Sequence, residues 1–167
     1  NLSTALMRSF ASRKDCSVVD EPFYAAYLKE TGIIHPMRDL ILNTYNFDPT
    51  EVAKRCLSNH VRTKLQYQKH MTHHMLDTFD RSFIHSVSNA FLIRSPEKVI
   101  KSFGKKITDF SLEDLGYVQQ AELFDMICDK TGIIPPVLDA DDLCARPASV
   151  LRGLCRKLEI NFSYKML

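Results

Sequence analysis

The chain has 167 residues, of which 45% are hydrophobic and 25% charged, and its formal net charge is +2 at pH 7. This size and composition are typical of one globular domain with a core of useful size. So mild a charge gives no reason to expect a nucleic-acid or membrane surface. No apolar run approaches the roughly 18 residues of a membrane span, and no signal peptide opens the sequence.

Both ends of the sequence look cut. It begins at Asn1 rather than Met, and it stops at Leu167 without a terminal element. We therefore expect a single domain over residues 1–167 from which a first strand and a C-terminal tail are missing.

Five cysteines stand at positions 16, 56, 128, 144 and 155. Their number is odd and no pair has C-x-x-C spacing, so neither a disulfide framework nor a zinc site is indicated. A reducing compartment fits best, and we expect a cytoplasmic protein.

Hydrophobic periodicity and turn residues predict short strands that alternate with helices. Helices are expected from Thr4 to about Ala11, from Pro22 to Gly32, from Pro49 onward, from Glu97 to Phe103, from Ser111 to Gly132 and from Pro147 to Leu158. Strands are expected at Ser17–Val19, Leu65–Lys69, Asn89–Ile93 and Pro136–Asp139. This order predicts an α/β fold with a mostly parallel sheet flanked by helices.

Polar residues follow each predicted strand. They are Asp20-Glu21, Lys69-His70, Arg94-Ser95 and Asp141-Asp142. Ligands of parallel α/β sheets bind beyond the carboxyl ends of the strands, so we expect these side chains to converge on one rim.

The segment from Phe91 to Ser102 is the most informative for chemistry. A buried strand ends at Arg94, Pro96 starts a helix, and Ser102 follows two turns later. A guanidinium can hold a phosphate bidentately, and a hydroxyl can add a hydrogen bond. An arginine at a strand end with a solvated serine is an equally ordinary interpretation.

This segment resembles the 3′-phosphate-binding element of sulfotransferases, which has the form R-x-P-x-x-V-x-x-S. Arg94, Pro96, Val99 and Ser102 occupy its four fixed positions. The resemblance implies a three-layer P-loop-type domain and the donor 3′-phosphoadenosine-5′-phosphosulfate as co-substrate, without a metal. It also implies that Arg94 and Ser102 bind the donor's 3′-phosphate.

Two further matches frame the chain. The opening Asn1-Leu-Ser3-Thr4 is similar to the end of the family's phosphosulfate loop, K-S-G-T-T-W-L, which implies Asn1, Ser3 and Thr4 as donor ligands at a helix start. Leu2 stands where the family often has glycine. Near the C-terminus, the stretch around Asp141 and Asp142 resembles a strand and helix of the family; we interpret these two carboxylates as a helix start.

The wider resemblance covers residues 1 to about 160. It is strongest to bacterial-type sulfotransferase-like proteins with N-x-S-T-x-M-R-S-F, V-V-D-E-P-F-Y and K-H-M-T-H-H, some of which carry branched-chain aminotransferase labels. Nothing in the sequence resembles a pyridoxal-phosphate site.

Lys69 and His70 resemble the strand end K-T-H of cytosolic sulfotransferases, where the lysine faces the transferring group and the histidine is the base. The histidine is offset by one position here. With His73 and His74 it could instead suggest a metal site, but no acidic or Cys partner stands at ligand spacing.

Glu21 is the other candidate base. It resembles the glutamate after the second strand of bacterial trehalose sulfotransferases, and a carboxylate beside aromatic residues can act as a base near neutral pH. A helix-start acid that complements the helix dipole is the ordinary alternative. We place Glu21 slightly ahead of His70.

The expected reaction is sulfuryl transfer to a hydroxyl or amine of a small molecule or glycan. Tyr24, Tyr27, His35 and Met37 are candidates for lining the acceptor pocket, although aromatic stripes are more often core. Two alternatives stay open: a P-loop kinase that uses ATP and Mg²⁺, and a non-catalytic nucleotide-binding module. The acceptor and the oligomeric state cannot be read from the sequence.

Overall fold

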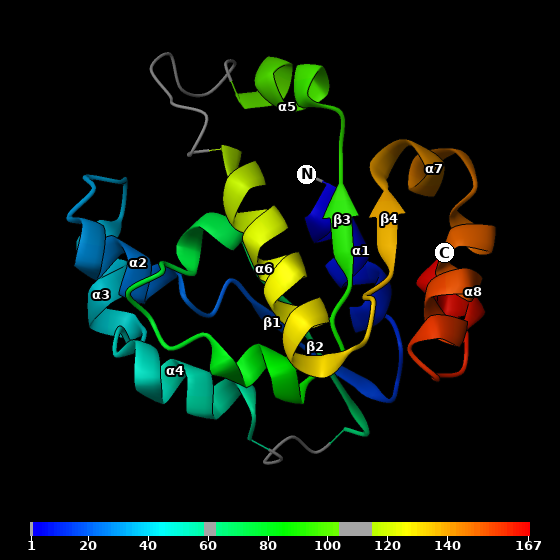
Figure 1. Ribbon diagram of the computed structural model, residues 1–167, viewed down its shortest axis with the longest axis horizontal. Helices are drawn as coiled ribbons and strands as arrows, with labels where there is room; N and C mark the ends of the chain where they lie inside the picture. The colour runs from blue at the N-terminus through cyan, green and yellow to red at the C-terminus, as the bar shows by residue number, and fades with distance from the viewer. Residues whose placement is uncertain (1, 59–62, 104–114) are drawn as a thin grey trace.

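The computed structural model describes residues 2–58, 63–103 and 115–167, which form a mixed arrangement of helices and short parallel strands (Figure 1). The helices are α1 (Leu2–Ala11), α2 (Tyr24–Thr31), α3 (Arg38–Thr44), α4 (Pro49–Cys56), α5 (Pro96–Phe103), α6 (Tyr117–Thr131), α7 (Ala140–Ala145) and α8 (Pro147–Lys157). The strands are β1 (Cys16–Asp20), β2 (Leu65–Lys69), β3 (Phe91–Ile93) and β4 (Val137–Asp139). Short 3₁₀ helices are η1 (Thr72–His74), η2 (Ser82–Ser86) and η4 (Tyr164–Met166).

The strands pair in parallel, as the alternation of strands and helices predicts. β1 pairs with β2, and β3 pairs with β4. Within the described residues these are two separate two-stranded sheets, so the single sheet expected from the sequence is not formed by these four strands alone.

Local sequence signals explain several boundaries. Asp48 accepts hydrogen bonds from the backbone N–H groups of Thr50 and Glu51, which makes it the N-cap of α4. The sequence Thr-Gly-Ile-Ile ends both α2 and α6, and Gly32 and Gly132 adopt the same left-handed conformation, with φ of 68°. Glycine favours this C-cap because it has no Cβ to clash.

Other boundaries differ from the sequence prediction. β3 begins at Phe91 rather than Asn89, because the Asn89 amide donates to the carbonyl oxygens of Ile84 and Val87 and so belongs to the preceding turn. Helix α6 begins at Tyr117, whereas its expected start, Ser111, lies outside the described residues. Helix α3 was not predicted, because its apolar residues Leu40, Ile41 and Leu42 are consecutive rather than spaced as on one helix face, and none of them is buried.

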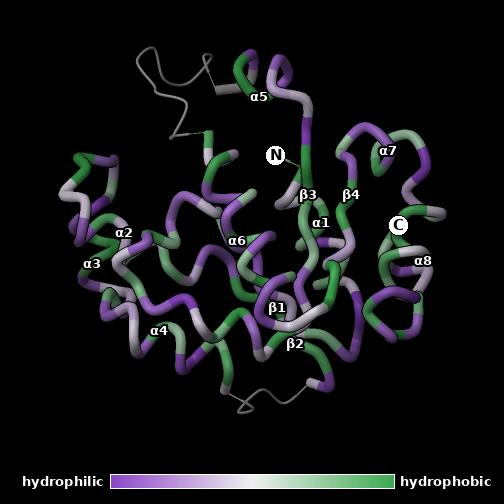
Figure 2. The backbone as a smooth tube through the Cα atoms, in the orientation of Figure 1, coloured by the Kyte–Doolittle hydropathy of each residue, from purple (hydrophilic) through white to green (hydrophobic). Residues whose placement is uncertain are grey.

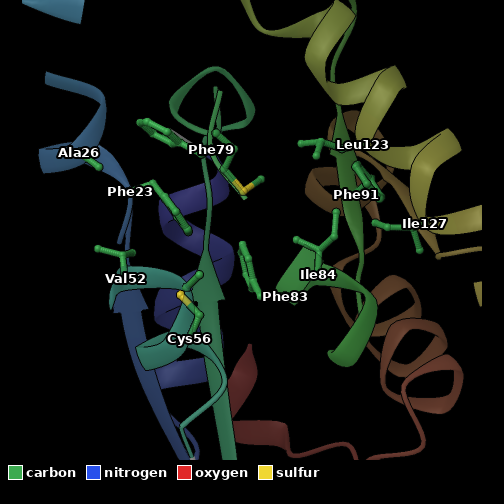
Figure 3. Close-up of a cluster of buried hydrophobic side chains, with 12 residues drawn as sticks. Phe23, Ala26, Val52, Cys56, Phe79, Phe83, Ile84, Phe91, Leu123 and Ile127 are labelled. Carbon is green, nitrogen blue, oxygen red and sulfur yellow. The ribbon is translucent and has the colours of Figure 1, made fainter. Parts of the chain in front are cut away.

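Two hydrophobic clusters hold the elements together. The first joins α2, α4, η2, β3 and α6; Figure 3 shows its aromatic members Phe23, Phe79, Phe83 and Phe91. The second joins α1 and α8 to all four strands. Phe91 belongs to the first cluster and its neighbour Leu92 to the second, so the clusters lie on opposite faces of β3.

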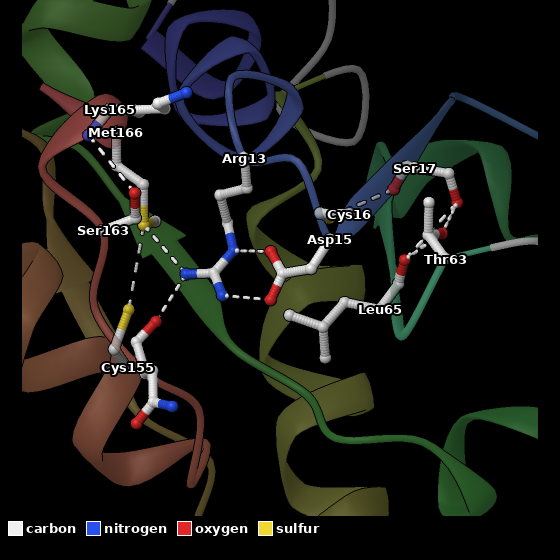
Figure 4. Close-up of polar contacts among 11 residues, drawn as sticks. Arg13, Asp15, Cys16, Ser17, Thr63, Leu65, Cys155, Ser163, Lys165 and Met166 are labelled. Atoms are coloured by element: carbon white, nitrogen blue, oxygen red, sulfur yellow. Dashed lines mark hydrogen bonds and ion pairs between the residues drawn. The ribbon is translucent and has the colours of Figure 1, made fainter.

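A buried arginine fastens the C-terminal segment to the turn after α1 (Figure 4). Arg13 is 5% exposed and makes a bidentate pair with Asp15, with N–O distances of 3.0 and 2.9 Å. Its third nitrogen donates to the carbonyl oxygen of Asn161 at 2.6 Å. The guanidinium thereby connects Arg13 to Asn161, which is 148 residues further along the chain, while its charge is paired with that of Asp15.

The helices are amphipathic rather than uniformly apolar, and hydrophobic and hydrophilic residues alternate along the backbone in Figure 2. In α8, for example, Leu151 and Leu154 are buried whereas Arg152 and Arg156 are exposed. No helix in residues 2–58, 63–103 and 115–167 has the length and hydropathy that crossing a bilayer requires.

Candidate active site

One buried ammonium joins the carboxyl ends of β1 and β2. The strand register sets Asp20 opposite Lys69. Lys69 Nζ donates to Asp20 Oδ1 at 2.7 Å and to Glu21 Oε1 at 2.5 Å. The Lys69 side chain is 4% exposed, against 51% for Asp20 and 27% for Glu21. Burial opposes the charged form, but hydrogen bonds to the two carboxylates outweigh it and raise the pKa of Lys69.

The backbone conformation of Glu21 places its side chain beside Lys69. Glu21 has a φ of 46°, the left-handed region that non-glycine residues rarely adopt. Its N–H donates to the carbonyl oxygen of Lys69 at 2.8 Å, and its own carbonyl accepts from the N–H of Tyr24 at 3.0 Å. The turn therefore continues the β1–β2 ladder by one bond and leads into α2. Strained backbone of this kind is common at functional sites.

A cluster of aromatic rings begins at the second oxygen of the Glu21 carboxylate. His74, at the end of η1, places Nδ1 3.9 Å from Glu21 Oε2. Its ring stacks on Tyr24, with centroids 4.8 Å apart, and packs against Tyr27 at 4.9 Å. Burial, with smaller contributions from nearby titratable groups led by His73, lowers the pKa of His74 to about 3.

The residues proposed for the acceptor pocket lie partly together. Tyr24 and His35 share a hydrogen bond of 2.8 Å between the phenol oxygen and Nδ1. Tyr27 packs against His73 and His74. Met37, with a φ of 65°, precedes α3 and is exposed. Tyr24, Tyr27 and His35 therefore extend from the Glu21 carboxylate to the surface.

His70 has a different environment. Its ring packs between Phe23 and Phe83, with centroid distances of 6.0 and 5.8 Å, and Nε2 lies 3.1 Å from the Gln68 side-chain oxygen. Burial lowers the pKa of His70 to about 4. The structure thus brings Glu21 and Lys69 together, whereas His70 is held in the aromatic core.

Arg94 follows β3 and is exposed. Within the described residues its guanidinium forms no ion pair with a carboxylate. Its carbonyl oxygen accepts a 2.8 Å hydrogen bond from the Tyr117 hydroxyl at the start of α6. Pro96 begins α5, and Lys98 in that helix pairs with Asp141 of α7 at 2.6 Å. The backbone at Arg94 is therefore fixed while its side chain stays open to solvent.

The other expected donor ligands are at the start of α1 and in α5. Ser3 and Thr4 lie in the first turn of α1 and are half-buried. Asn1 lies outside the described residues, and so does the side chain of Ser102, which is in α5. Asp141 and Asp142 stand in the first turn of α7 with Asp139 as N-cap, which confirms their interpretation as a helix start.

A groove of about 1050 Å³ runs between α1, the start of α8 and the C-terminal segment. Its lining includes Thr4, Arg8, Arg146 and Met166 but neither Glu21 nor Lys69. In the part of the chain that the structure describes, no three His, Cys, Asp or Glu side chains are grouped as a metal site requires. All five cysteines are free.

Comparison with known proteins identifies the class. The family model described as "Sulfotransferase domain" matches residues 1–167, and the chain therefore belongs to the sulfotransferase domain family. The chain is 36% identical over 167 residues to the Arabidopsis thaliana "Branched-chain-amino-acid aminotransferase-like protein 2" and 37% identical to "protein 1" of the same name. It is matched over its whole length and spans 30% of each relative. No solved structure matches it.

Sequence reasoning named Glu21 and Lys69 as candidate site residues, and the structure adds the contacts that hold them. Asp20 is the second acceptor of the Lys69 ammonium, and His74 lies against the free side of the Glu21 carboxylate. The predicted strand ends already placed Asp20 and Lys69 at one rim, which was a usable signal for the first contact. The second depends on the 3₁₀ turn of η1, for which the sequence holds no pattern.

Proposed function

We propose that the chain binds 3′-phosphoadenosine-5′-phosphosulfate and transfers its sulfuryl group to a hydroxyl or amine, with Glu21 as the base. The observation that carries this proposal is the Glu21–Lys69 pair at the carboxyl ends of β1 and β2, in a chain of the sulfotransferase domain family. The proposal includes a three-layer P-loop arrangement for the domain and a cytoplasmic location for the reaction.

In the proposed reaction the acceptor oxygen or nitrogen forms a bond to sulfur while the bond from sulfur to the donor's phosphate oxygen breaks. The acceptor proton passes to Glu21, and 3′,5′-diphosphoadenosine leaves with the negative charge. Such transfers depend mainly on positioning and charge stabilisation. Lys69 supplies a positive charge beside the base, and Ser3 and Thr4 stand in a helix first turn, where backbone N–H groups favour an anion.

Glu21 is a better candidate base than His70. Its carboxylate is 27% exposed, so an acceptor can reach it. The His70 ring packs against Phe23 and Phe83, and its pKa, lowered to about 4 by burial, makes it a weaker proton acceptor than an ordinary histidine. For the donor, the exposed Arg94 guanidinium supports a role in binding the 3′-phosphate, together with Ser102.

A transfer assay with ³⁵S-labelled donor tests the proposal. The chain is incubated with the donor and a panel of sugars, phenols, sterols and amines, and label is followed in products and in free sulfate. We expect one acceptor class to be labelled, with a rate about 10²–10⁴-fold lower in Glu21→Gln. His70→Asn is the matched control and should stay within about threefold of the parent. Label transfer that is equal in the parent and Glu21→Gln would remove Glu21 from the reaction.

A further inference from the structure

The His74 ring is fixed in place by its neighbours. Only 5% of the residue is exposed, and the ring lies between the aromatic rings of Tyr24 and Tyr27. The turn that carries it is held from behind, because Thr72 Oγ1 donates to the carbonyl oxygen of Gly116 at 2.9 Å. Gly116 has a φ of 73°, and a Cβ there would come within 2.7 Å of Thr72 Oγ1. The start of α6 therefore packs tightly against η1.

One nitrogen of this ring points toward the candidate base. Within the described part of the chain, Nδ1 is buried and has no hydrogen-bond partner, and it lies 3.9 Å from Glu21 Oε2. Burying a polar atom without a partner costs about 1–3 kcal/mol, so an uncompensated ring nitrogen requires an explanation. Catalytic hydrogen bonds are often long in unliganded structures and shorten when the substrate binds.

The protonation state of His74 follows from its surroundings. The pKa lowered to about 3 keeps the ring neutral at pH 7. The titratable groups around it are Lys69, Glu21, Tyr24, Tyr27, His35, His70 and His73. A neutral imidazole carries one N–H. A lone pair on Nδ1 would face the Glu21 carboxylate and be repelled, whereas an N–H there would be attracted.

We propose that His74 is a positioning residue for Glu21, with its single ring proton on Nδ1 and directed at Oε2. Lys69 Nζ donates to Oε1 of the same carboxylate. The two oxygens of the base would then each face a donor, Lys69 from β2 and His74 from η1. This inference rests on the proposed function for its consequence in catalysis, but the tautomer it requires is a property of the chain alone. In this role His74 does not itself take the acceptor proton, because the ring nitrogen that faces Glu21 already carries the ring proton.

The tautomer is measured directly by long-range ¹H–¹⁵N NMR on the chain labelled with ¹⁵N-histidine. We expect the His74 ring to show the Nδ1–H tautomer at pH 7 and to stay neutral down to about pH 5. An Nε2–H tautomer or a protonated ring at pH 7 would overturn the proposal. This measurement needs no donor or acceptor, so it decides the point even if the chain transfers no sulfuryl group.

Two amide substitutions test the consequence for catalysis. The side-chain nitrogen of His74→Asn lies near the position of Nδ1, whereas that of His74→Gln lies near Nε2. With the labelled donor, we expect His74→Asn to keep the transfer rate within about fivefold and His74→Gln to lose at least about 20-fold in kcat at an unchanged KM for the donor. The acid limb of the rate profile should move to higher pH in His74→Gln alone. Equal rates and equal profiles in two folded variants would overturn the positioning role.

Discussion

Lys69 and Glu21 form an ion pair across the ends of two strands, with Nζ 2.5 Å from Oε1, and the same ammonium donates to Asp20 at 2.7 Å. Two carboxylates thus share one buried positive charge, which leaves a net negative charge at the candidate base. An acceptor hydroxyl or amine brings a proton that such a site attracts. Lys69 therefore fixes the position of the Glu21 carboxylate and also supplies a positive charge to the site.

Replacing Lys69 by Met should lower both activity and stability. The substitution leaves Asp20 and Glu21 as adjacent unpaired carboxylates and removes two charged hydrogen bonds. We expect the sulfuryl transfer rate to fall at least about 100-fold and the free energy of unfolding to fall by about 2 kcal/mol. Asp20→Asn is the matched control: it keeps the Lys69–Glu21 pair and should cost less than half as much in urea unfolding. Equal losses of unfolding free energy in the two variants would show that the Lys69–Glu21 contact adds nothing to stability beyond the Lys69–Asp20 contact.

Gly116→Ala should destabilise the chain more than Gly32→Ala. Both glycines have left-handed backbone, with φ of 73° and 68°, so alanine is strained at each by about 1 kcal/mol. At Gly116 the new Cβ also meets Thr72 Oγ1 at 2.7 Å, whereas nothing lies within 4 Å at Gly32. We expect Gly116→Ala to lose about 1–2 kcal/mol more in urea unfolding. The packing of α6 on η1 would be in doubt if both variants lost the same amount.

Acid should unfold the chain partly through His70 and His74. The pKa of His70 is lowered to about 4, so between pH 6.5 and about 4 the unfolded chain binds a proton that the folded chain does not. Stability therefore falls as the pH is lowered through this window, by up to about 1.4 kcal/mol per pH unit for His70. His74 acts in the same direction, with a folded pKa of about 3. Urea unfolding of His70→Asn from pH 4.5 to 6.5 should show a shallower slope than the parent, and an unchanged slope would contradict this account.

The Arg13–Asp15 pair should contribute stability at neutral pH and lose it in acid. The side-chain hydrogen bond from Arg13 lowers the pKa of Asp15, so the contribution is present above the ordinary aspartate pKa and disappears as the pH falls through the lowered value. Because the Asp15 side chain is 42% exposed, water screens the pair, and we expect Asp15→Asn to cost only about 1 kcal/mol at pH 7. The measurement is urea unfolding at pH 7 and at pH 3. A penalty that does not shrink in acid would mean that packing, not charge, is lost.

The parts of the fold predicted from the sequence are those with a strong local signal. The alternation of Leu65–Lys69 gives the bounds of β2, and Asp48 with Pro49 gives the start of α4, because strand pattern and helix cap are encoded within a few residues. The apolar residues of helix α3 are consecutive in the sequence, so no helical periodicity reveals it. The separation of the strands into two pairs also depends on long-range packing that no local pattern encodes.

The candidate site also has a part that the sequence indicates and a part that depends on the fold. Lys69 ends β2 and Glu21 directly follows β1, and the resemblance to sulfotransferases pointed to both of them. The contact of His74 with Glu21 depends on the 3₁₀ turn η1, in which His74 is the last residue. The packing of His70 depends on Phe23 and Phe83, which come from different elements. Residue types at strand ends can thus be read from the sequence, whereas the partners of each side chain require the fold.

Donor binding is the central claim, and it is tested most directly by thermal unfolding of the chain with and without 3′,5′-diphosphoadenosine, in the parent and in Arg94→Ala. Saturation at about 100 times the Kd stabilises a protein by about 2.7 kcal/mol. We predict a rise in Tm of several degrees for the parent without Mg²⁺, and little or no rise for Arg94→Ala. A rise of equal size in both proteins, or a rise only with ATP and Mg²⁺, would contradict the assignment of Arg94 to the donor's 3′-phosphate.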